Sequence, residues 1–182
     1  FALKPGSRDS SLLVDLLPGA YTMVAASQTT GSGIALVEAY DADGSRTSGT
    51  ERLVNIATRA RAGAGDAALI AGFVVSGSVP KQLLIRGIGP GLVQFGVDEV
   101  LLTTELSVYA GDRMIARNVG WGSASESAAI AAAASKVGAF GLTSGSADSA
   151  LLAFFAPGAY TAQVTGVGNA AGNALIEVYE VP

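Results

Sequence analysis

The sequence predicts an all-β protein of the β-sandwich or jelly-roll type, built from tandem three-stranded units and carrying one short helix. Hydrophobic residues make up 49% of the 182 residues, charged residues make up only 14%, and 24 residues are glycine. This mixture is typical of short strands joined by tight turns. About eleven apolar or alternating segments follow one another at short intervals, and only one stretch has a helical composition.

One segment occurs twice in the chain. Residues 1–43 align without a gap with residues 140–182 at an offset of 139, with 18 identities that include Pro-Gly-Ala-Tyr-Thr entire. Chance does not produce such agreement, so the chain is predicted to be part of a tandem array that holds the tail of one unit and then one whole unit. Phe1 has its counterpart Phe140 inside the repeat, so we expect the N-terminus of the gene product to lie upstream.

Each copy of this segment predicts three strands. In the first copy, 11–17 and 20–26 are expected to form a hairpin around Pro18 and Gly19, followed by a third strand at 34–41. The same strands are expected at 148–155, 159–166 and 173–180. We therefore expect the two copies to superpose as the same three-stranded unit.

Alternation along the second strand of each copy places a tyrosine on an apolar face. Tyr21 shares its face with Met23 and Ala25, and Tyr160 shares its face with Ala162 and Val164. A period of two indicates a half-buried strand. We expect both tyrosines to be largely buried in equivalent places.

The middle of the chain predicts further strands and the helix. Residues 67–76 are apolar on both faces, which is typical of a central strand covered on both sides. Ser123 and Glu126 form a Ser-x-x-Glu capping box before an alanine-rich helix over 124–136. The other expected strands are 52–58, 81–87, 104–109 and 113–117.

Two β-sandwich blocks are expected. Residues 1–92 would form the first block, containing the tail of one repeat and the start of the next, and residues 93–182 would form the second, with the helix. Residues 42–51 are the best linker candidate because they are polar and rich in turn-forming residues. Neither block contains every segment of a repeat, so residues 140–182 of one chain are expected to meet residues 1–43 of the next.

Composition excludes several classes of function. A net charge of −4 argues against nucleic acid as a partner, because phosphate binding needs clustered lysine and arginine. The absence of histidine and cysteine removes Ser-His-Asp triads, thiolate chemistry and the commonest metal ligand. No membrane-spanning helix is expected, since turn-forming residues interrupt the uncharged stretch at 149–176.

Glu38, Glu105, Glu126 and Glu177 are the candidates for a pair of glycosidase carboxylates. Glu38 and Glu177 occupy matching positions in the two copies, so any role they have occurs twice. A role in every unit favours a structural hydrogen bond or ion pair on the sheet face. The sequence therefore predicts no catalytic residues and no enzyme.

Two motifs suggest ligands. Asp41 and Asp43 lie in Asp-Ala-Asp-Gly, which offers two carboxylates and a tight turn to a calcium ion, although an EF-hand loop would require Glu where Arg52 stands. A solvated turn explains the same residues. Trp121 could stack on a sugar, but a lone tryptophan between glycines more often fills a core. No other cofactor is expected.

Five stretches carry a family resemblance: Arg52–Ile56, Gly72–Val75, Leu84–Pro90, Pro157–Thr161 and Glu177–Tyr179. In these stretches the chain resembles an uncharacterised repeat of large secreted bacterial proteins. From Leu106 onward the chain also resembles the pre-peptidase C-terminal type of β-sandwich. The resemblance implies an all-β, extracellular, non-catalytic repeat. In that pattern an acidic turn precedes the tryptophan, whereas this chain has Asn118-Val119-Gly120-Trp121 without the carboxylate.

Two functions follow as hypotheses. The first is a structural subunit of an extracellular or cell-surface bacterial filament, sheath or adhesive array that assembles head-to-tail with copies of itself. The alternative is a carbohydrate-binding module of a secreted enzyme, with an extracellular glycan as partner and a groove holding Trp121, Tyr109 or Tyr179.

Overall fold

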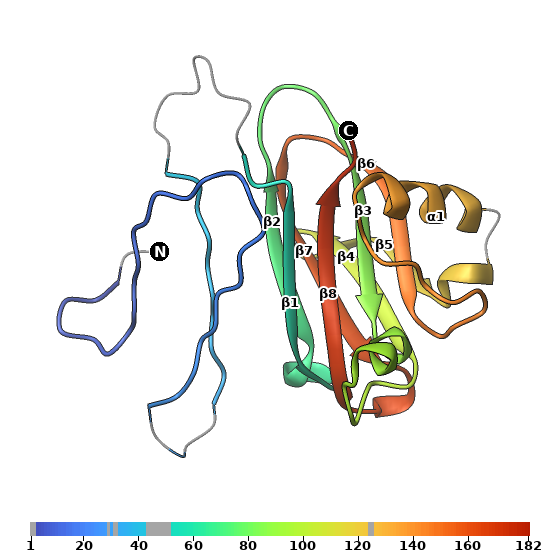
Figure 1. Ribbon diagram of the computed structural model, residues 1–182, viewed down its shortest axis with the longest axis horizontal. Coiled ribbons are helices and arrows are strands. Elements are labelled where there is room, and N and C mark those ends of the chain that lie inside the picture. The colour runs from blue at the N-terminus through green and yellow to red at the C-terminus, as the bar shows by residue number, and fades with distance from the viewer. Residues whose placement is uncertain (1–2, 29, 31–32, 43–51, 124–125) are drawn as a thin grey trace. The chain divides into compact units, whose positions relative to one another are not determined.

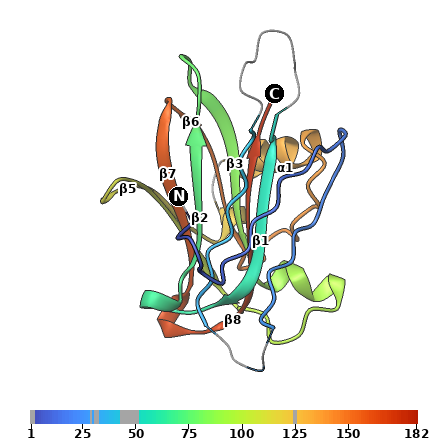
Figure 2. The same cartoon turned by 90° about the vertical axis from the view of Figure 1, so that its left-hand side faces the viewer.

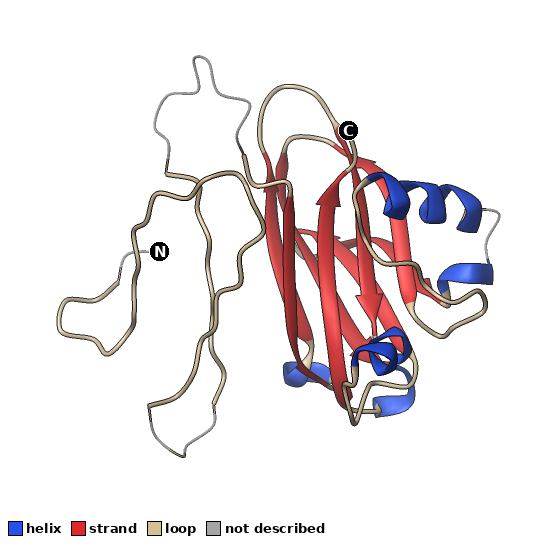
Figure 3. Ribbon diagram, in the orientation of Figure 1, coloured by secondary structure: helices blue, strands red, loops and turns tan. Residues whose placement is uncertain are grey.

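The computed structural model describes residues 3–28, 30, 33–42, 52–123 and 126–182, and the chain divides into two units, Phe1–Leu53 and Val54–Pro182. The second unit is a β-sandwich of two antiparallel four-stranded sheets with one α-helix, which confirms the expected fold class (Figures 1 and 3). Its helix is α1 (Ser127–Lys136). Its strands are β1 (Asn55–Ala62), β2 (Leu69–Val75), β3 (Lys81–Ile88), β4 (Thr104–Ala110), β5 (Arg113–Val119), β6 (Ser149–Phe155), β7 (Gly158–Gly166) and β8 (Gly172–Glu180).

The core lies between the two sheets, which pack face to face (Figure 2). One sheet has the strand order β1-β8-β3-β6 and the other has the order β2-β7-β4-β5. Alternate residues of each strand point inward, as a period of two requires. The fully buried inward side chains include Ile85, Leu106, Val108, Val164 and Ile176.

A second apolar cluster lies on the other face of the β1-β8-β3-β6 sheet, beneath α1. Ile130, Ala133 and Ala134 of the helix pack with Leu84 of β3 and Ala150 of β6. The helix is rich in alanine, so it can approach the sheet closely. It begins at Ser127, later than expected, and its N-cap residue Glu126 makes no side-chain capping hydrogen bond.

The last three strands do not form one sheet. β6 and β8 both pair with β3, whereas β7 lies in the other sheet between β2 and β4. Pro157 and Gly158 therefore carry the chain from one sheet to the other. The prediction that the strands on either side of them form a hairpin is wrong. Crossing over lets the apolar faces of β6 and β7 meet across the core, where Phe155 and Tyr160 are in edge-to-face contact.

The expected domain boundary at residues 92 and 93 falls inside the sandwich. β1, β2 and β3 precede it and pair with β8, β7 and β6 respectively, which follow it. The division lies instead between Leu53 and Val54, directly after the predicted linker. Residues 54–182 thus contain a whole sandwich, and the expectation that its strands divide between two separate blocks is wrong.

The first two strands of the sandwich also differ from expectation. β1 starts at Asn55 and reaches Ala62, because all eight residues pair with β8. β2 is an edge strand rather than a central one. Its outward side chains Ile70 and Val74 are 53% and 73% exposed. The apolar residues on both faces of β2 therefore do not mean that both faces are covered, and the prediction of a central strand at 67–76 is wrong.

The first unit differs from its counterpart in the sandwich. Its described residues form no helix or strand and are exposed, so the expected superposition of 11–41 on 150–180 is corrected. A strand needs neighbours for its backbone hydrogen bonds, and β6, β7 and β8 take theirs from β1 to β4. Tyr21 is 58% exposed, against the expectation of burial, whereas Tyr160 is half-buried.

The local geometry of the two tyrosine turns is nevertheless the same. The Tyr21 hydroxyl donates to the Leu17 carbonyl at 2.7 Å, and the Tyr160 hydroxyl donates to the Ala156 carbonyl at 2.9 Å. Each bond spans four residues and closes over Pro-Gly-Ala. This resembles the tyrosine hydrogen bond that fixes a corner in immunoglobulin-type sandwiches.

We predict that truncating the two tyrosines has unequal effects. Tyr160 stacks on Phe73 at 5.5 Å and meets Phe155 at 5.2 Å between ring centroids. Tyr160→Ala should lower the free energy of unfolding of the sandwich by about 3 kcal/mol. Tyr21→Ala should change it by less than about 0.5 kcal/mol. Urea unfolding of both variants checks this, and equal losses would contradict it.

Candidate functional site

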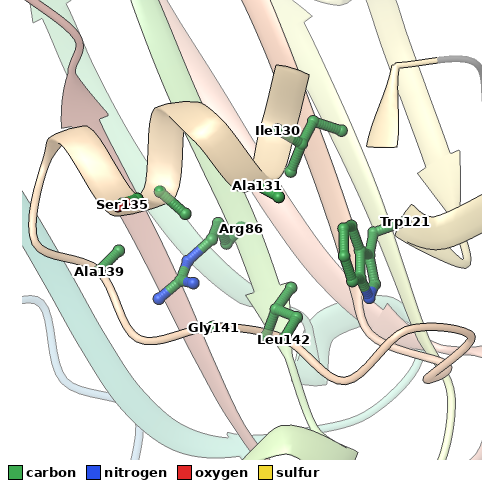
Figure 4. Close-up of a pocket in the computed structure, with 9 residues that line it drawn as sticks. Arg86, Trp121, Ile130, Ala131, Ser135, Ala139, Gly141 and Leu142 are labelled. Carbon is green, nitrogen blue, oxygen red and sulfur yellow. The ribbon is translucent and has the colours of Figure 1, made fainter. Parts of the chain in front are cut away.

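A cavity of about 310 Å³ lies beneath α1 on the sheet face (Figure 4). Apolar side chains and glycine dominate its wall, with Arg86 of β3 as the one charged group among the lining residues. The lining residues are Arg86, Trp121, Ile130, Ala131, Ala134, Ser135, Ala139, Gly141 and Leu142. The site is therefore a partly open gap between helix and sheet with a cation in its floor.

Arg86 is fully buried, and its donors are directed to protein acceptors. Its Nε donates to Oε2 of Glu177 at 2.8 Å, and its Nη2 donates to the same oxygen. Its Nη1 donates to the Phe140 carbonyl at 2.5 Å, and its guanidinium carbon lies 4.5 Å from the centre of the Phe140 ring. The cation is thus neutralised by Glu177 and held by hydrogen bonds, as a buried charge requires.

Tyr179 completes this arrangement. Its hydroxyl donates to Oε1 of Glu177 at 2.8 Å, so the carboxylate accepts from Arg86 on one oxygen and from Tyr179 on the other. Register explains the meeting, because Arg86 faces Glu177 and Leu84 faces Tyr179 across the β3–β8 pair. The structural role expected for Glu177 is confirmed, and its partner is a buried arginine.

The pKa of Tyr179 provides a pH-dependent test. Burial first, and then the Glu177 carboxylate, raise its pKa from 10.0 to about 12. The unfolded tyrosine therefore loses its proton before the folded one does. The contribution of Tyr179 to the free energy of unfolding is therefore fully present below pH 10 and is lost as the pH rises toward about 12.

We therefore expect the free energy of unfolding to fall with pH across this alkaline window. Tyr179→Phe should make that fall less steep, because it removes the ionising group. Chemical unfolding of the parent and the variant at a series of alkaline pH values measures the two slopes. A variant whose stability falls as steeply as the parent's would contradict the assignment.

A second buried cluster lies at the end of β3, where Asp148 is fully buried. The amides of Gly89 and Gly91 donate to its Oδ1 at 2.8 and 3.1 Å, and the Ser146 hydroxyl donates to its Oδ2 at 2.6 Å. The Gly-x-Gly geometry is required here. A side chain on Gly89 would lie 2.0 Å from the Leu101 carbonyl oxygen.

The hydroxyls of Thr104 and Ser149 extend this cluster. The two hydroxyl oxygens lie 2.8 Å apart. The Gly87 carbonyl is an acceptor for both hydroxyls, at 2.8 Å from Thr104 and 3.1 Å from Ser149. The start of β6 is thus fixed to the end of β3 by side chains as well as by the strand ladder. The Asp148 carboxylate thus binds a turn that is distant in the sequence.

Trp121 fills the core, which confirms the packing interpretation. It is 6% exposed, and its indole nitrogen donates to the Thr143 carbonyl at 3.2 Å and to the Ser146 hydroxyl at 3.1 Å. The ring therefore offers no exposed face for a sugar. Tyr109 and Tyr179 are half-buried.

The lining residues of the cavity include none of the other candidate carboxylates. Glu105 forms a two-pronged ion pair with Arg117 across β4 and β5, with both contacts at 2.7 Å, and this pair lowers the pKa of Glu105. Glu38 lies in the first unit, where it accepts from the Tyr40 hydroxyl at 2.9 Å. Glu126 is exposed at the start of α1.

Asp41 is exposed, and Asp43 lies outside the described residues, so the calcium hypothesis stays a prediction. Within the part of the chain that the structure describes, acidic side chains form no cluster of three or more that could hold a metal ion.

Three of the buried polar residues have identical counterparts in the first copy of the repeated segment. Asp9 and Asp148, Ser10 and Ser149, and Glu38 and Glu177 are identical pairs at the repeat offset. Polar residues retained in two copies of one segment indicate specific partners. Arg86 and the Gly89-Pro90-Gly91 turn that bind these residues lie outside the repeated segment, so the repeat does not indicate those partners.

Among the described residues, no helix has the length and apolar character needed to cross a membrane. No family model matches the chain, and no curated protein matches it. A solved structure that is similar to it is the pre-peptidase C-terminal domain of a collagenase from Bacillus anthracis, at 13% identity and a TM-score of 0.41. The match covers 69% of this chain and 89% of that chain.

Proposed function

We propose that the chain is a non-catalytic structural subunit of an extracellular bacterial array, such as a filament, sheath or adhesive layer, and that it assembles head-to-tail with copies of itself. The observation that carries the proposal is the apolar surface of the first unit. Large apolar side chains there are exposed, including Leu12 at 84%, Leu13 at 89% and Ile34 at 96%. Extensive exposure of large apolar side chains is typical of an interaction surface.

The chemistry of the sandwich supports a structural role. Its buried charged groups, Arg86, Glu177 and Asp148, bind one another or the backbone, and the cavity beneath α1 is lined mainly by apolar side chains. General acid–base catalysis needs a titratable group free to reach a substrate. Secretion is part of the proposal and rests on the sequence resemblance to repeats of secreted bacterial proteins.

Negative-stain electron microscopy of the full chain over a range of concentrations tests this function. We expect extended or branched assemblies whose length increases with concentration. Particles of a single subunit at every concentration would contradict it.

A further inference from the structure

We propose that the cavity beneath α1 binds a small neutral molecule that has an apolar body and one carbonyl oxygen, and that Arg86 donates hydrogen bonds to that oxygen. Every lining residue lies in the sandwich, so this inference is independent of the proposed self-assembly. Three properties of the cavity support it: the small residues at its mouth, the donors in its floor and the electrical neutrality of that floor.

The mouth of the cavity is bordered by small residues. Ala131 and Ser135 lie four residues apart on α1 and therefore on one face of it, and both are exposed. Gly141, in the segment that follows the helix, is exposed as well. Figure 4 shows α1 on one side of the cavity and the segment that carries Ala139 and Gly141 on the other. Short side chains on both sides leave room for a small molecule to enter without a change of fold.

The interior of the cavity is apolar and has the size of a small ligand. Trp121 and Ile130, which are 6% and 3% exposed, form part of its buried wall with Leu142. Its volume of about 310 Å³ lies near the lower limit of about 300–1,000 Å³ for ligand pockets. Apolar walls offer few hydrogen bonds to water, so replacement of that water by an apolar molecule is favourable.

Arg86 has two N–H groups left for a ligand. A guanidinium carries five N–H donors. Among the described residues, three of these donors have acceptors: two donate to one oxygen of Glu177 and one donates to the Phe140 carbonyl. Arg86 is fully buried, so the other two do not face bulk solvent. Because buried donors need acceptors, an oxygen atom held in the cavity would satisfy them.

The charge of the floor favours a neutral oxygen. Glu177, only 5% exposed, already balances the charge of Arg86, and Arg86 is the one charged group among the lining residues. A ligand carboxylate would therefore add a buried negative charge without a cation to balance it, which is unfavourable. A carbonyl oxygen accepts two hydrogen bonds and has no hydrogen that would itself need an acceptor. Ketones, esters and tertiary amides are thus the expected class of ligand.

Saturation-transfer NMR of the full chain tests the site with three probes of similar size. Acetophenone carries the carbonyl, α-methylstyrene has a methylene group in place of the carbonyl oxygen, and benzoate is an anion. We expect acetophenone to bind with a dissociation constant on the order of millimolar, at least about threefold more tightly than α-methylstyrene. A cavity without donors would instead favour the hydrocarbon, because a carbonyl costs more to remove from water. Benzoate should bind at least about tenfold more weakly than acetophenone at neutral pH.

Substitutions at the mouth locate the bound molecule. Ala131→Leu and Ser135→Leu each place a longer side chain at the entrance, and each should weaken acetophenone binding at least about tenfold. Ala132→Leu is the matched control, because Ala132 is exposed on the same helix but does not line the cavity. This control should bind acetophenone as the parent does. Circular dichroism of the three variants verifies that each retains the fold.

The outcomes are distinct. Loss of acetophenone binding in both mouth variants, with the preference for the ketone over both other probes in the parent, would support the site and the class of ligand. Equal binding by the mouth variants and the control would place the ligand elsewhere and overturn the proposal. Tighter binding of α-methylstyrene or of benzoate, or no saturation transfer to acetophenone, would overturn it as well.

Discussion

Arg86→Met is expected to lower the free energy of unfolding of the sandwich by about 3–5 kcal/mol. The substitution keeps much of the side-chain volume but leaves the Glu177 carboxylate buried without its cation, since Glu177 is only 5% exposed. Urea or guanidinium unfolding, followed by circular dichroism, measures the loss. Glu177→Gln should have an effect in the same direction, because it leaves the guanidinium uncompensated.

An exposed ion pair provides the matched control. Nη1 of Arg61 lies 2.8 Å from Oε2 of Glu99, and the two side chains are 60% and 75% exposed. Arg61→Met should therefore cost less than about 1 kcal/mol. The double variant Arg86→Met/Glu177→Leu should recover much of the loss, because replacing both charges removes the buried imbalance. If Arg86→Met costs no more than Arg61→Met, Arg86 does not have the buried structural role assigned to it.

Asp148→Ala is expected to cost roughly 2–4 kcal/mol, because it leaves the buried Gly89 amide, at about 1–3 kcal/mol, and the half-buried Gly91 amide without an acceptor. The Ser146 hydroxyl loses its acceptor as well. Asp148→Asn keeps one acceptor oxygen and should cost less.

Asp112→Ala is the control for this prediction, because Asp112 lies exposed in the turn between β4 and β5. Its substitution should change stability by less than about 0.5 kcal/mol. Thermal and chemical unfolding of the three variants give the comparison. A loss at Asp148 as small as that at Asp112 would show that the turn after β3 does not depend on the carboxylate.

Alternation and turn residues were enough to predict most strands of the sandwich. β3 to β8 lie where apolar periodicity and flanking glycine or proline placed them, within a few residues. These signals are local, so they identify a strand without identifying its neighbours. The hairpin expected at Pro157 and Gly158 shows this limit, because a Pro-Gly turn can either reverse a strand within one sheet or carry it to the other.

Partner strands and burial required three-dimensional information. β2 is apolar on both faces and yet lies at a sheet edge, with Val74 73% exposed. The first unit has nearly the same residue pattern as β6, β7 and β8 but none of their regular structure. The difference comes from the strands that accompany them, since the same pattern pairs with β1 to β4 in one copy and lacks such partners in the other.

The candidate site was predictable in part. The repeat identified Glu177 as structural, and composition favoured a buried Trp121. The pairing of Arg86 with Glu177 joins strands that lie far apart in the sequence, so spacing along the chain could not indicate it. Asp148 was missed for the same reason, because its acceptor role depends on a turn 57 and 59 residues away.

Sedimentation velocity of the full chain beside residues 54–182 tests most directly whether the first unit drives assembly. The shorter chain contains the whole sandwich and lacks the exposed apolar segment. We predict that the full chain forms species whose sedimentation coefficients increase with concentration, while residues 54–182 sediment as a single small species. Assembly of residues 54–182 to the same extent as the full chain, or a full chain that stays monomeric, would contradict this role of the first unit.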